Sequence, residues 1–488
     1  MGSSNIYTEL NHQYIHGQWI NGSSTRQADN INPYNQELIH QFQLANTADL
    51  DAAYTAAKSA QSAWEKTSPA ERIALIQRVE EILKARGEEI IDWIIRESGS
   101  TRLKASIELA AAQGITAEAK TFPLRVNGEI LPTSVPHQQS RIYRKALGVI
   151  GVISPWNFPF HLSMRSVITA VALGNTVVLK PASDTPVTGG TLLAKIFEEA
   201  GFPAGVLNVV VGAGSEIGDY FVEHAVPSLI SFTGSTEIGK RVGQLAVGGK
   251  YLKRIALELG GNAPMVVLDD ANLEQAVELT VLGRFLHQGQ ICMSTNRVIV
   301  DAKIYDDFVA LLGHKVKELV IGDPDDMGTL IGPIINQSQV RNIERIIAQA
   351  KASNAQMIIG GETQGQVIPP HVFIDVDPQS ALAREESFGP ILPVIKARDE
   401  AHALELANDT EYGLSSAVCT TNHERGVNFA LGIEAGMTHI NDITVDDQSH
   451  APFGGEKNSG LGRFNGHWII EEFTRTHWVT LQTKPKTA

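Results

Sequence analysis

The feature that most limits the fold of this chain is an alternation of short apolar runs with helical patterns in its middle. The intervening helical patterns include Thr188–Ala200 and Glu216–His224. Strands buried on both faces of a sheet have continuous apolar runs, so we expect a parallel sheet with crossover helices in an α/β fold. The expected strands are Leu147–Ile153, Thr176–Leu179, Leu207–Val211 and Leu229–Phe232.

Further patterns surround this sheet. Helical spacing uninterrupted by proline precedes it, and a second alternation that starts near Ile255 predicts another α/β domain. Two β-like segments, Arg141–Ala146 and Thr476–Thr483, lie outside both units. The helical runs are Ala52–Ala60, Glu71–Arg86 and Ile90–Glu97, and the second alternation comprises Met265–Leu268, Leu273–Leu286, Arg297–Val300 and Tyr305–Val320.

Composition excludes several classes of protein. A chain of 488 residues is long enough for two or three domains. Its net charge of -14 offers no basic surface for nucleic acid, and the nearest basic cluster, Lys250–Arg254, is short. Met1–Gly22 lacks a secretory pattern, and no run of about 18 apolar residues indicates a membrane span. We therefore expect a cytoplasmic protein that binds neither nucleic acid nor membrane.

The two cysteines of the chain have different surroundings. They form no disulfide framework, and without clustered cysteine and histidine ligands we expect no metal site. Cys292 lies in Gly-Gln-Ile-Cys-Met-Ser, after Gly289, which allows close backbone approach. A thiol with an ordinary pKa of about 8.5 supplies some thiolate at neutral pH, which is a potent nucleophile. Cys419 ends the apolar run Leu414–Cys419, and we expect it to pack in a core.

Glu258 is the candidate base for this nucleophile. It follows the expected strand Arg254–Leu257, and the pair Gly260–Gly261 then turns the chain. A carboxylate at a strand end can point into a cleft, where burial raises its pKa and makes it a useful general base.

A set of ordered motifs accompanies Cys292 and Glu258. Together the motifs resemble those of the NAD(P)-dependent aldehyde dehydrogenases, from about Gly17 to the C-terminus. The motifs are Trp156–Pro159, Phe232–Ser235, Glu258–Gly261, Gly289–Ser294, Glu386–Pro390 and Pro452–Gly455.

The resemblance implies a domain plan. It comprises a Rossmann-like NAD(P)-binding domain, residues 1–122 and 148–257, and a catalytic α/β domain, residues 258–475. Residues 123–147 and 476–488 would form a small β oligomerisation arm. By resemblance alone, we expect a homodimer or homotetramer.

The resemblance also implies where NAD or NADP binds. Two glycine-containing turns, Val211–Gly218 and Phe232–Gly239, each follow a strand and open a helix, whose free amides can hold a pyrophosphate. Lys180 would meet the adenosine ribose, and Ser183 occupies the position where the family often has a glutamate. Without that carboxylate to repel a 2′-phosphate, we expect either cofactor to work. The implied cofactor-binding residues are Trp156, Lys180, Ser183, Gly212, Gly234, Ser235, Gly239, Glu386 and Phe388, the last two at the nicotinamide ribose and ring.

The implied reaction begins with attack of Cys292 on an aldehyde. Asn157 and the backbone amide of Cys292 would stabilise the tetrahedral thiohemiacetal. Hydride transfer to the nicotinamide gives a thioester, and Glu258 activates the water that releases a carboxylic acid. The presence of Glu258 favours hydrolysis over acyl transfer to coenzyme A.

Several residues near these motifs suggest the substrate. Phe285–Thr295 and His439–Val445 resemble the branch that oxidises aromatic aldehydes, which includes benzaldehyde, salicylaldehyde and vanillin dehydrogenases. Arg165 also resembles this branch and has two interpretations: it lines the pocket and favours a polar ring substituent, or it forms a salt bridge on a helix surface. The apolar residues expected to form a pocket for a hydrophobic aldehyde are Phe158, Leu162, Ile291, Met293 and Phe453.

Three alternatives stay open. An aliphatic aldehyde or semialdehyde dehydrogenase would share the mechanism. A cofactor-independent cysteine esterase could share the nucleophile, oxyanion donor and base, but would leave Lys180, Glu386 and Phe388 without a purpose. A non-catalytic binding protein of the same fold is disfavoured because Cys292 and its expected partners are intact.

Overall fold

A parallel sheet forms where the apolar runs alternate with helical patterns. The computed structural model describes residues 7–485, so Met1–Ile6 and the last three residues of the expected domains lie outside the described residues. The first sheet has the order β2-β1-β9-β8-β7-β10-β11-β21, and its five central strands are parallel. The chain runs outward from β7 in both directions, as in doubly wound folds. These strands are β7 (Val149–Ile153), β8 (Thr176–Lys180), β9 (Leu207–Val209), β10 (Leu229–Thr233) and β11 (Arg254–Glu258).

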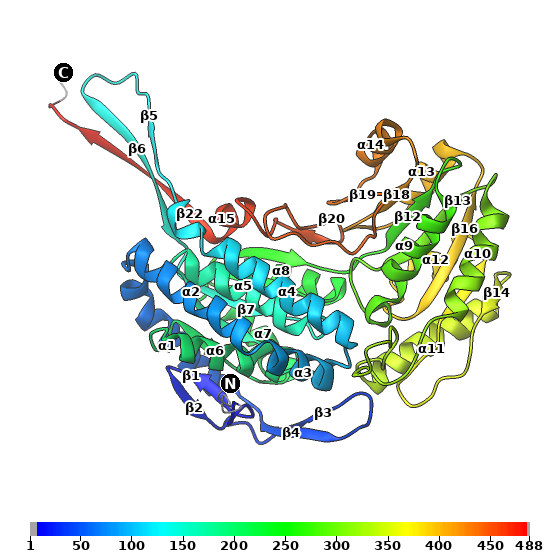
Figure 1. Ribbon diagram of the computed structural model, residues 1–488. Helices are drawn as coiled ribbons and strands as arrows, with labels where there is room; N and C mark the ends of the chain where they lie inside the picture. Colours follow the sequence, from blue (N-terminus) through cyan, green and yellow to red (C-terminus); the bar gives the residue numbers. More distant parts are fainter. Residues whose placement is uncertain (1–6, 486–488) are drawn as a thin grey trace.

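Helices pack on this sheet and on each other. The first two helices begin with capping boxes, in which Asn46 and Ser68 accept hydrogen bonds from the first turn. The three helical runs expected from the sequence lie in α1 to α3, whereas α4 was not among them. Helix α5 packs on β7 and β8, and α4 lies against α5 (Figure 1). The helices are α1 (Thr47–Glu65), α2 (Pro69–Ala85), α3 (Gly87–Ser98), α4 (Arg102–Ala119), α5 (Pro159–Ala172), α6 (Leu192–Ala200), α7 (Asp219–Glu223) and α8 (Thr236–Gly248).

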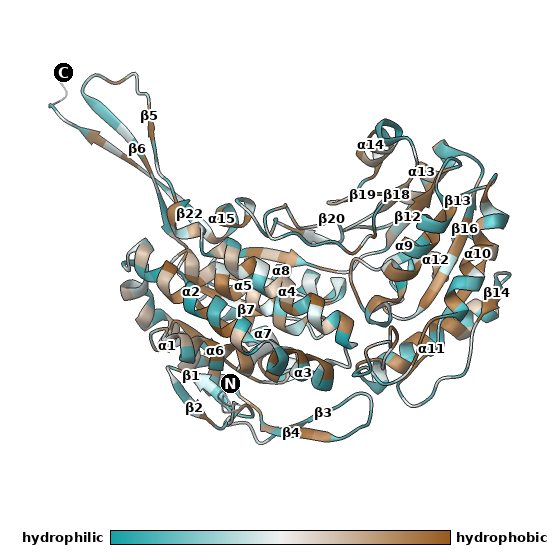
Figure 2. Ribbon diagram, in the orientation of Figure 1, coloured by the Kyte–Doolittle hydropathy of each residue, from teal (hydrophilic) through white to brown (hydrophobic). Residues whose placement is uncertain are grey.

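A second sheet confirms the second expected α/β unit. Its order is β14-β15-β16-β13-β12-β18-β19, and only the edge strand β14 is antiparallel to its neighbour. Figure 2 shows that the strands at the centre of this sheet are apolar. The strands are β12 (Ala263–Val267), β13 (Thr295–Asp301), β14 (Gln356–Ile359), β15 (His371–Ile374), β16 (Ile391–Ala397), β18 (Ala417–Cys419) and β19 (His439–Ile440), and the helices are α9 (Leu273–Phe285), α10 (Tyr305–Lys317), α11 (Gln337–Lys351), α12 (Ala381–Arg384), α13 (Glu400–Asn408) and α14 (His423–Gly432).

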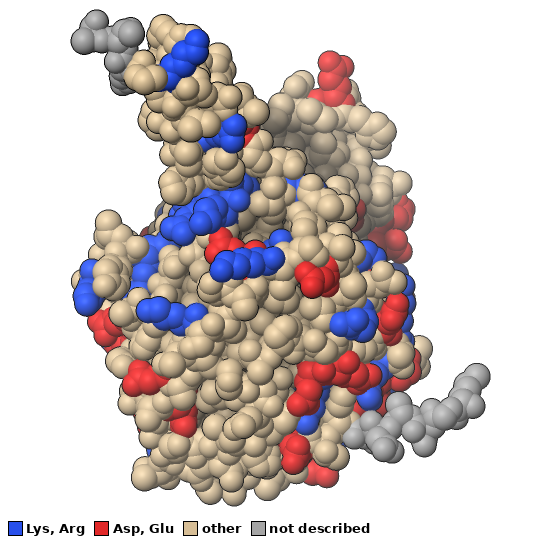
Figure 3. Space-filling view, turned by 90° about the vertical axis from the view of Figure 1, so that its left-hand side faces the viewer, with Lys and Arg blue, Asp and Glu red and all other residues tan. Residues whose placement is uncertain are grey.

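An antiparallel arm of three strands projects from the body (Figure 1). Strand β6 (Gln138–Ala146) pairs with β22 (Thr474–Gln482) along its whole length, and β5 (Glu129–Leu131) pairs on its other side. The two β-like segments expected from the sequence therefore lie together. Figure 3 shows basic side chains on this arm and near its base, interspersed with acidic ones lower on the same face.

The last part of the chain returns to the first sheet. Strand β21 (Gly460–Leu461) pairs antiparallel with β11, and α15 (Trp468–Phe473) follows it. Phe464 and Phe473 are buried in the same hydrophobic core as residues of β7 and β8. Although the expected catalytic domain extends to residue 475, this segment adds to the first sheet because its apolar side chains complete that core.

Short strands and turns make up the rest. Among residues 7–485, no helix is long and apolar enough to cross a membrane, and no group of side chains is placed to hold a metal ion. The remaining strands are β1 (Gln13–Ile15), β2 (Gln18–Ile20), β3 (Gln27–Ile31), β4 (Leu38–Gln43), β17 (Tyr412–Gly413) and β20 (Glu456–Lys457).

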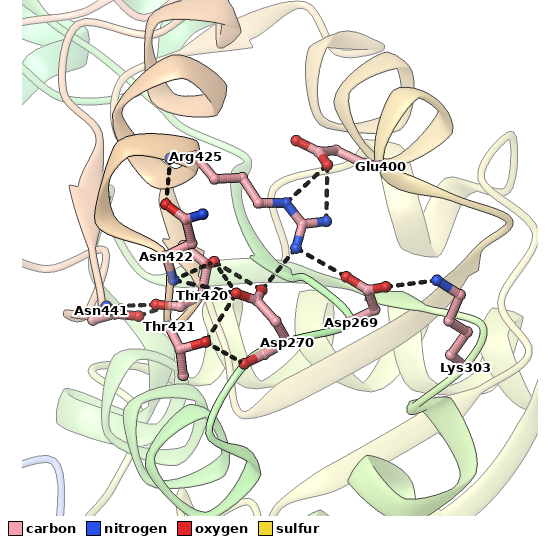
Figure 4. A network of polar contacts seen from close by, with 9 residues as sticks. All are labelled: Asp269, Asp270, Lys303, Glu400, Thr420, Thr421, Asn422, Arg425 and Asn441. Atoms are coloured by element: carbon pink, nitrogen blue, oxygen red, sulfur yellow. Dashed lines mark hydrogen bonds and ion pairs between the residues drawn. The ribbon is translucent and has the colours of Figure 1, made fainter.

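A polar network ties the second sheet to its helices (Figure 4). Arg425 on α14 donates to Asp269 and Asp270, which follow β12, at 2.9 Å each, and to Glu400 on α13 at 2.9 Å. Asp270 also accepts from Thr420 and Thr421. Hydrogen bonds from Lys303 and Arg425 lower the pKa of Asp269. The network thus joins two helices to the ends of two strands.

Replacing Arg425 with methionine should destabilise the second domain by about 2 kcal/mol at pH 7, because Asp270 and Glu400 lose their charged partner and Asp269 keeps only Lys303. The thermal midpoint should fall by roughly 4–8 °C. The pKa of Asp269 is lowered in the fold, so this stabilisation is present at neutral pH and is lost as pH falls from about 5 through the lowered pKa. The difference in thermal midpoint between the wild type and Arg425→Met should therefore narrow in acid.

The matched control is Arg241→Met. Arg241 pairs with Asp219 alone, and both side chains are at least half exposed. A surface pair of this kind contributes about 0–1 kcal/mol, so the midpoint should barely move. Equal shifts for the two variants would contradict a special role for the Arg425 network.

Candidate active site

A cavity of about 270 Å³ lies at the carboxyl edge of the first sheet and reaches loops of the second domain. Residues that follow β7 and β10 lie on one side of it. The chain order reverses between these two adjacent strands, which is where doubly wound sheets bind ligands. Its lining consists of Pro155, Trp156, Asn157, Thr233, Gly234, Ser235, Leu259, Gly260, Cys292, Gln339, Asn342, Glu386 and Phe388.

The turn after Glu258 lies directly against the Cys292 segment. A Cβ atom added to Gly261 would be 2.3 Å from the carbonyl oxygen of Cys292, and one added to Gly260 would be 2.5 Å from Oε2 of Glu386. Only glycine fits at position 261, where the close atom belongs to the backbone, whereas a side chain at position 260 would displace the Glu386 carboxylate. The Gly260–Gly261 pair therefore brings the Glu258, Cys292 and Glu386 segments together.

The segment before Cys292 has an unusual backbone. His287, Gln288 and Gly289 have φ values of 51°, 57° and 75°, a left-handed conformation that non-glycine residues rarely adopt. Cys292 is partly exposed and lines the cavity, whereas Cys419 is buried as expected. Burial, followed by the nearby charges of Glu386 and Glu258, raises the pKa of the Cys292 thiol to about 12. Its attack on a substrate therefore requires loss of a firmly held proton.

Glu258 is the last residue of β11, which confirms its predicted position at a strand end. Its side chain is buried, and neither carboxyl oxygen has a hydrogen-bond partner among the described residues. Burial raises the pKa of Glu258 to about 8, partly offset by the charge of Arg165. A carboxylate with a raised pKa is a stronger base than an ordinary one, and its free oxygens can accept a proton from water.

Asn157 lies beside Cys292 on the wall of the cavity. Its Nδ2 donates to the backbone oxygen of Gln290 at 2.9 Å, and its Oδ1 accepts from the amide of Phe158 at 3.0 Å. A side-chain amide carries two N–H groups. One is used by Gln290, so the second is available to a ligand in the cavity.

One side of the cavity has the features that a dinucleotide requires. Helix α8 begins after Ser235, whose Oγ accepts from the amide of Ile238 at 3.4 Å, and the amides of Thr236 and Glu237 stay available for an anion. Oε1 of Glu386 accepts from the amide of Gly261 at 2.9 Å, and the ring of Phe388 meets that of Trp156 edge-on at 5.4 Å. The acidic side chain and the aromatic rings fit a ribose and a nicotinamide respectively, so the residues present are compatible with NAD or NADP.

The other expected cofactor residues lie outside this cavity. Lys180 is buried at the end of β8, where burial lowers its pKa to about 8, and Ser183 is exposed three residues later. A Cβ atom on Gly212 would be 2.4 Å from Ile217, and one on Gly239 would be 2.2 Å from Leu259. The glycine at position 239 therefore permits close packing of α8. Cofactor contacts from these residues stay predictions.

The expected substrate residues also do not line this cavity. Ile291, Met293 and Phe453 belong to the large hydrophobic core of the first domain, Phe158 and Cys292 pack against that core, and Leu162 is also buried. The apolar side chains thus lie near Cys292 without facing the cofactor side of the cavity. They are Phe158, Leu162, Ile291, Met293 and Phe453.

Arg165 is buried within α5, with only 1% of its surface exposed. Its guanidinium lies 4.5 Å from the ring centroids of both Phe453 and Phe464, and Nη1 is 3.6 Å from Asp447. The expected salt bridge is therefore present, to Asp447, but its expected place on a helix surface is wrong, because every residue of α5 is buried. The charge of Arg165 acts on both Glu258 and Cys292.

Several polar residues near the site are not among those expected from the sequence. Asp447 accepts from Asn465 at 2.6 Å and lies 3.0 Å from the ring of His161. Arg284, fully buried, donates to the backbone oxygen of Gly389, so it joins α9 to the loop that carries Glu386. No recognisable motif or spacing marks these residues in the sequence. The missed residues are Lys104, Glu108, His161, Arg284, His287 and Asp447.

With this geometry in place, comparison with known sequences is informative. The sequence profile described as the aldehyde dehydrogenase family matches residues 19–479. This match covers nearly the whole chain, and it includes the second sheet, the first sheet apart from β1 and the start of β2, and most of the arm. The protein belongs to the aldehyde dehydrogenase family.

Particular relatives narrow the similarity. The chain is 56% identical to a vanillin dehydrogenase from Corynebacterium glutamicum, over 96% of this chain and 97% of the relative. It is 49% identical to a benzaldehyde dehydrogenase from Bacillus subtilis, over 98% of each. The crystal structure of an NAD-dependent benzaldehyde dehydrogenase from Corynebacterium glutamicum superposes with a TM-score of 0.91 at 52% identity, covering 99% of this chain and 98% of that chain.

Proposed function

We propose that this protein oxidises an aromatic aldehyde to the carboxylic acid, with NAD or NADP as the hydride acceptor. The observation that carries the proposal is that one cavity joins the thiol of Cys292 and the amide of Asn157 to Gly234, Ser235 and Glu386. The nucleophile and the expected nicotinamide ribose site therefore lie side by side. A cofactor-independent esterase would have no use for the second half of this cavity.

Each catalytic residue has one role in the proposed reaction. The Cys292 sulfur, once deprotonated, attacks the carbonyl carbon and forms a thiohemiacetal. The free N–H of Asn157 and the backbone amide of Cys292 donate to its oxyanion. NAD or NADP, held beside Cys292 by Glu386 and Phe388, would supply the hydride acceptor that is needed to oxidise the thiohemiacetal on Cys292 to a thioester. Glu258 then removes a proton from water, whose oxygen attacks the thioester carbonyl and releases the acid and the thiol.

Support for an aromatic substrate comes from two sources. The two relatives that are 56% and 49% identical to this chain are named as a vanillin dehydrogenase and a benzaldehyde dehydrogenase. Phe158, Ile291 and Met293 give Cys292 an apolar neighbourhood that suits a ring. An aliphatic aldehyde or semialdehyde remains the alternative substrate for the same machinery.

A panel of aldehydes tests the substrate. Benzaldehyde and vanillin should be oxidised with kcat/KM at least about 10-fold above that of heptanal, which has the same carbon number as benzaldehyde. Formation of the reduced cofactor should be followed by absorbance with NAD and, separately, with NADP, and both should support turnover. Equal or higher kcat/KM for heptanal would reject the aromatic assignment while leaving aldehyde oxidation intact.

The projecting arm suits a role in assembly. Ile130 and Trp478 are 82% and 65% exposed, and several neighbours on β6 and β22 are also exposed apolar residues. An uncovered apolar sheet with free edges is a site for association between chains. We therefore propose a homodimer or homotetramer in which the arm, residues 123–147 and 476–488, contacts another subunit. We also propose the expected division into an NAD(P)-binding domain, a catalytic domain and the arm. The proposed location is the cytoplasm.

A further inference from the structure

A buried ion pair lies under the Asn157 loop, and the reaction described above does not use it. Lys104 and Glu108 project from α4 one helical turn apart, and neither side chain is exposed. Nζ of Lys104 lies 2.5 Å from Oε2 of Glu108 and donates to the backbone oxygen of Asn157 at 2.6 Å. Burying two charges is costly, so a pair retained in this position calls for a purpose.

Glu108 holds the other end of the same short segment. Its Oε1 accepts from the backbone amides of Phe160 and His161 at 2.8 and 3.2 Å, which are orphan donors in the first turn of α5. Nζ of Lys104 also lies 4.1 Å from the ring centroid of Phe158, between these two anchors. One ammonium and one carboxylate thus fix the main chain on both sides of Phe158.

The side chain of Asn157 is held from the opposite direction. Its Nδ2 donates to the backbone oxygen of Gln290, two residues before Cys292. Gln290 is fixed in turn, because its Oε1 accepts from the amide of Ile335 at 3.0 Å. Lys104 holds the main chain of Asn157 and Gln290 holds its side chain. The orientation of the second side-chain N–H of Asn157 is therefore fixed.

We propose that Lys104, paired with Glu108, is a positioning residue for acyl transfer. It holds the Asn157 carbonyl so that the free N–H of the Asn157 side chain points at the oxyanion formed over Cys292. The inference rests on the proposed role of Asn157. Oxyanion donors act because they are fixed before the charge develops, and a displacement of about 1 Å can cost roughly 100-fold in rate.

Acylation by p-nitrophenyl acetate tests the proposal without any cofactor. The ester transfers its acetyl group to the Cys292 sulfur and releases p-nitrophenolate, whose absorbance reports the acylation burst. Lys104→Met/Glu108→Gln removes both charges, so no unpaired ion is left buried. We expect its burst rate constant to fall about 30-fold, which is less than the roughly 100-fold cost of a full 1 Å displacement of the donor. Binding of NAD, measured by fluorescence titration, should change less than about 3-fold.

A double-mutant cycle with Asn157→Ala separates positioning from general damage. If Lys104 acts through Asn157, the paired variant should slow the burst less than about 3-fold in the Asn157→Ala background. The inference would be overturned if the paired variant slowed the burst by the same factor in the wild-type and Asn157→Ala backgrounds. An unchanged burst in the paired variant would also overturn it. An unchanged burst in Asn157→Ala alone would instead reject the proposed role of Asn157. Should the paired variant not fold, Lys104→Arg, which keeps the charge but moves the donor, enters the same cycle with the same criterion.

Discussion

Cys292→Ala should abolish aldehyde oxidation, with steady-state formation of the reduced cofactor falling by at least about 10⁴-fold. The sulfur forms the covalent bond on which both half-reactions depend, and no other described side chain of the cavity offers a thiol in its place. The variant should still bind NAD, because the carboxylate of Glu386 and the α8 terminus are untouched. Absorbance of the reduced cofactor measures the loss, and fluorescence titration measures binding.

The chain offers a matched control in its second cysteine. Cys419 is buried in the second sheet, and Cys419→Ala removes a thiol of the same size without touching the cavity. This variant should keep its activity and lose only a little thermal stability. Activity above about 1% of wild type in Cys292→Ala would show that the nucleophile is elsewhere.

Glu258→Gln should give one burst of reduced cofactor per active site and then nearly stop. Hydride transfer precedes the water step, so the thioester still forms, but its hydrolysis should slow by about 10²–10⁴-fold without the base. Mass spectrometry after acid quenching should find the acyl group on Cys292. The burst amplitude is the criterion, since Glu258 also influences the Cys292 thiol and its loss can change the burst rate.

The pH dependence of hydrolysis in the wild type follows from the same carboxyl. Only its ionised form accepts a proton, and burial raises its pKa to about 8. The hydrolysis rate should therefore rise with pH, by up to about tenfold per unit below pH 8, and level off above it. Glu278→Gln, a change at an exposed glutamate, should leave this profile unchanged. Steady turnover in Glu258→Gln, or a flat wild-type profile between pH 6 and 9, would contradict the role of Glu258.

Central strands of both sheets could be predicted from the sequence because they are buried on two faces, whereas exposed edge strands such as β2 and β14 could not. Strands β7, β8 and β10 have almost no exposed residues, so their apolar runs stand out from the helices between them. Cys292 and Asn157 could be predicted to share a site from short motifs that resemble those of the aldehyde dehydrogenases, each of which spans only a few consecutive residues. Local patterns of this kind need no knowledge of distant contacts.

Contacts between distant segments could not be predicted in the same way. Lys104 meets the carbonyl of Asn157 across 53 residues, and no periodicity links an isolated lysine on one helix to a loop beyond another. The burial of Arg165 depends on Phe453 and Phe464, which arrive from the far end of the chain. Strand β21 is only two residues long. Each of these features is decided by tertiary packing, which a single sequence does not display.

The return of the chain to the first sheet has a consequence for its synthesis. Strand β11 gains its neighbour β21, and the first core gains Phe464 and Phe473, only after the whole second domain has left the ribosome. Until then the nascent first domain exposes an unpaired strand edge and an open patch of core, both of which invite aggregation. Cellular production should consequently benefit from chaperones, and a stop codon shortly before residue 460 should be far more damaging than its late position suggests.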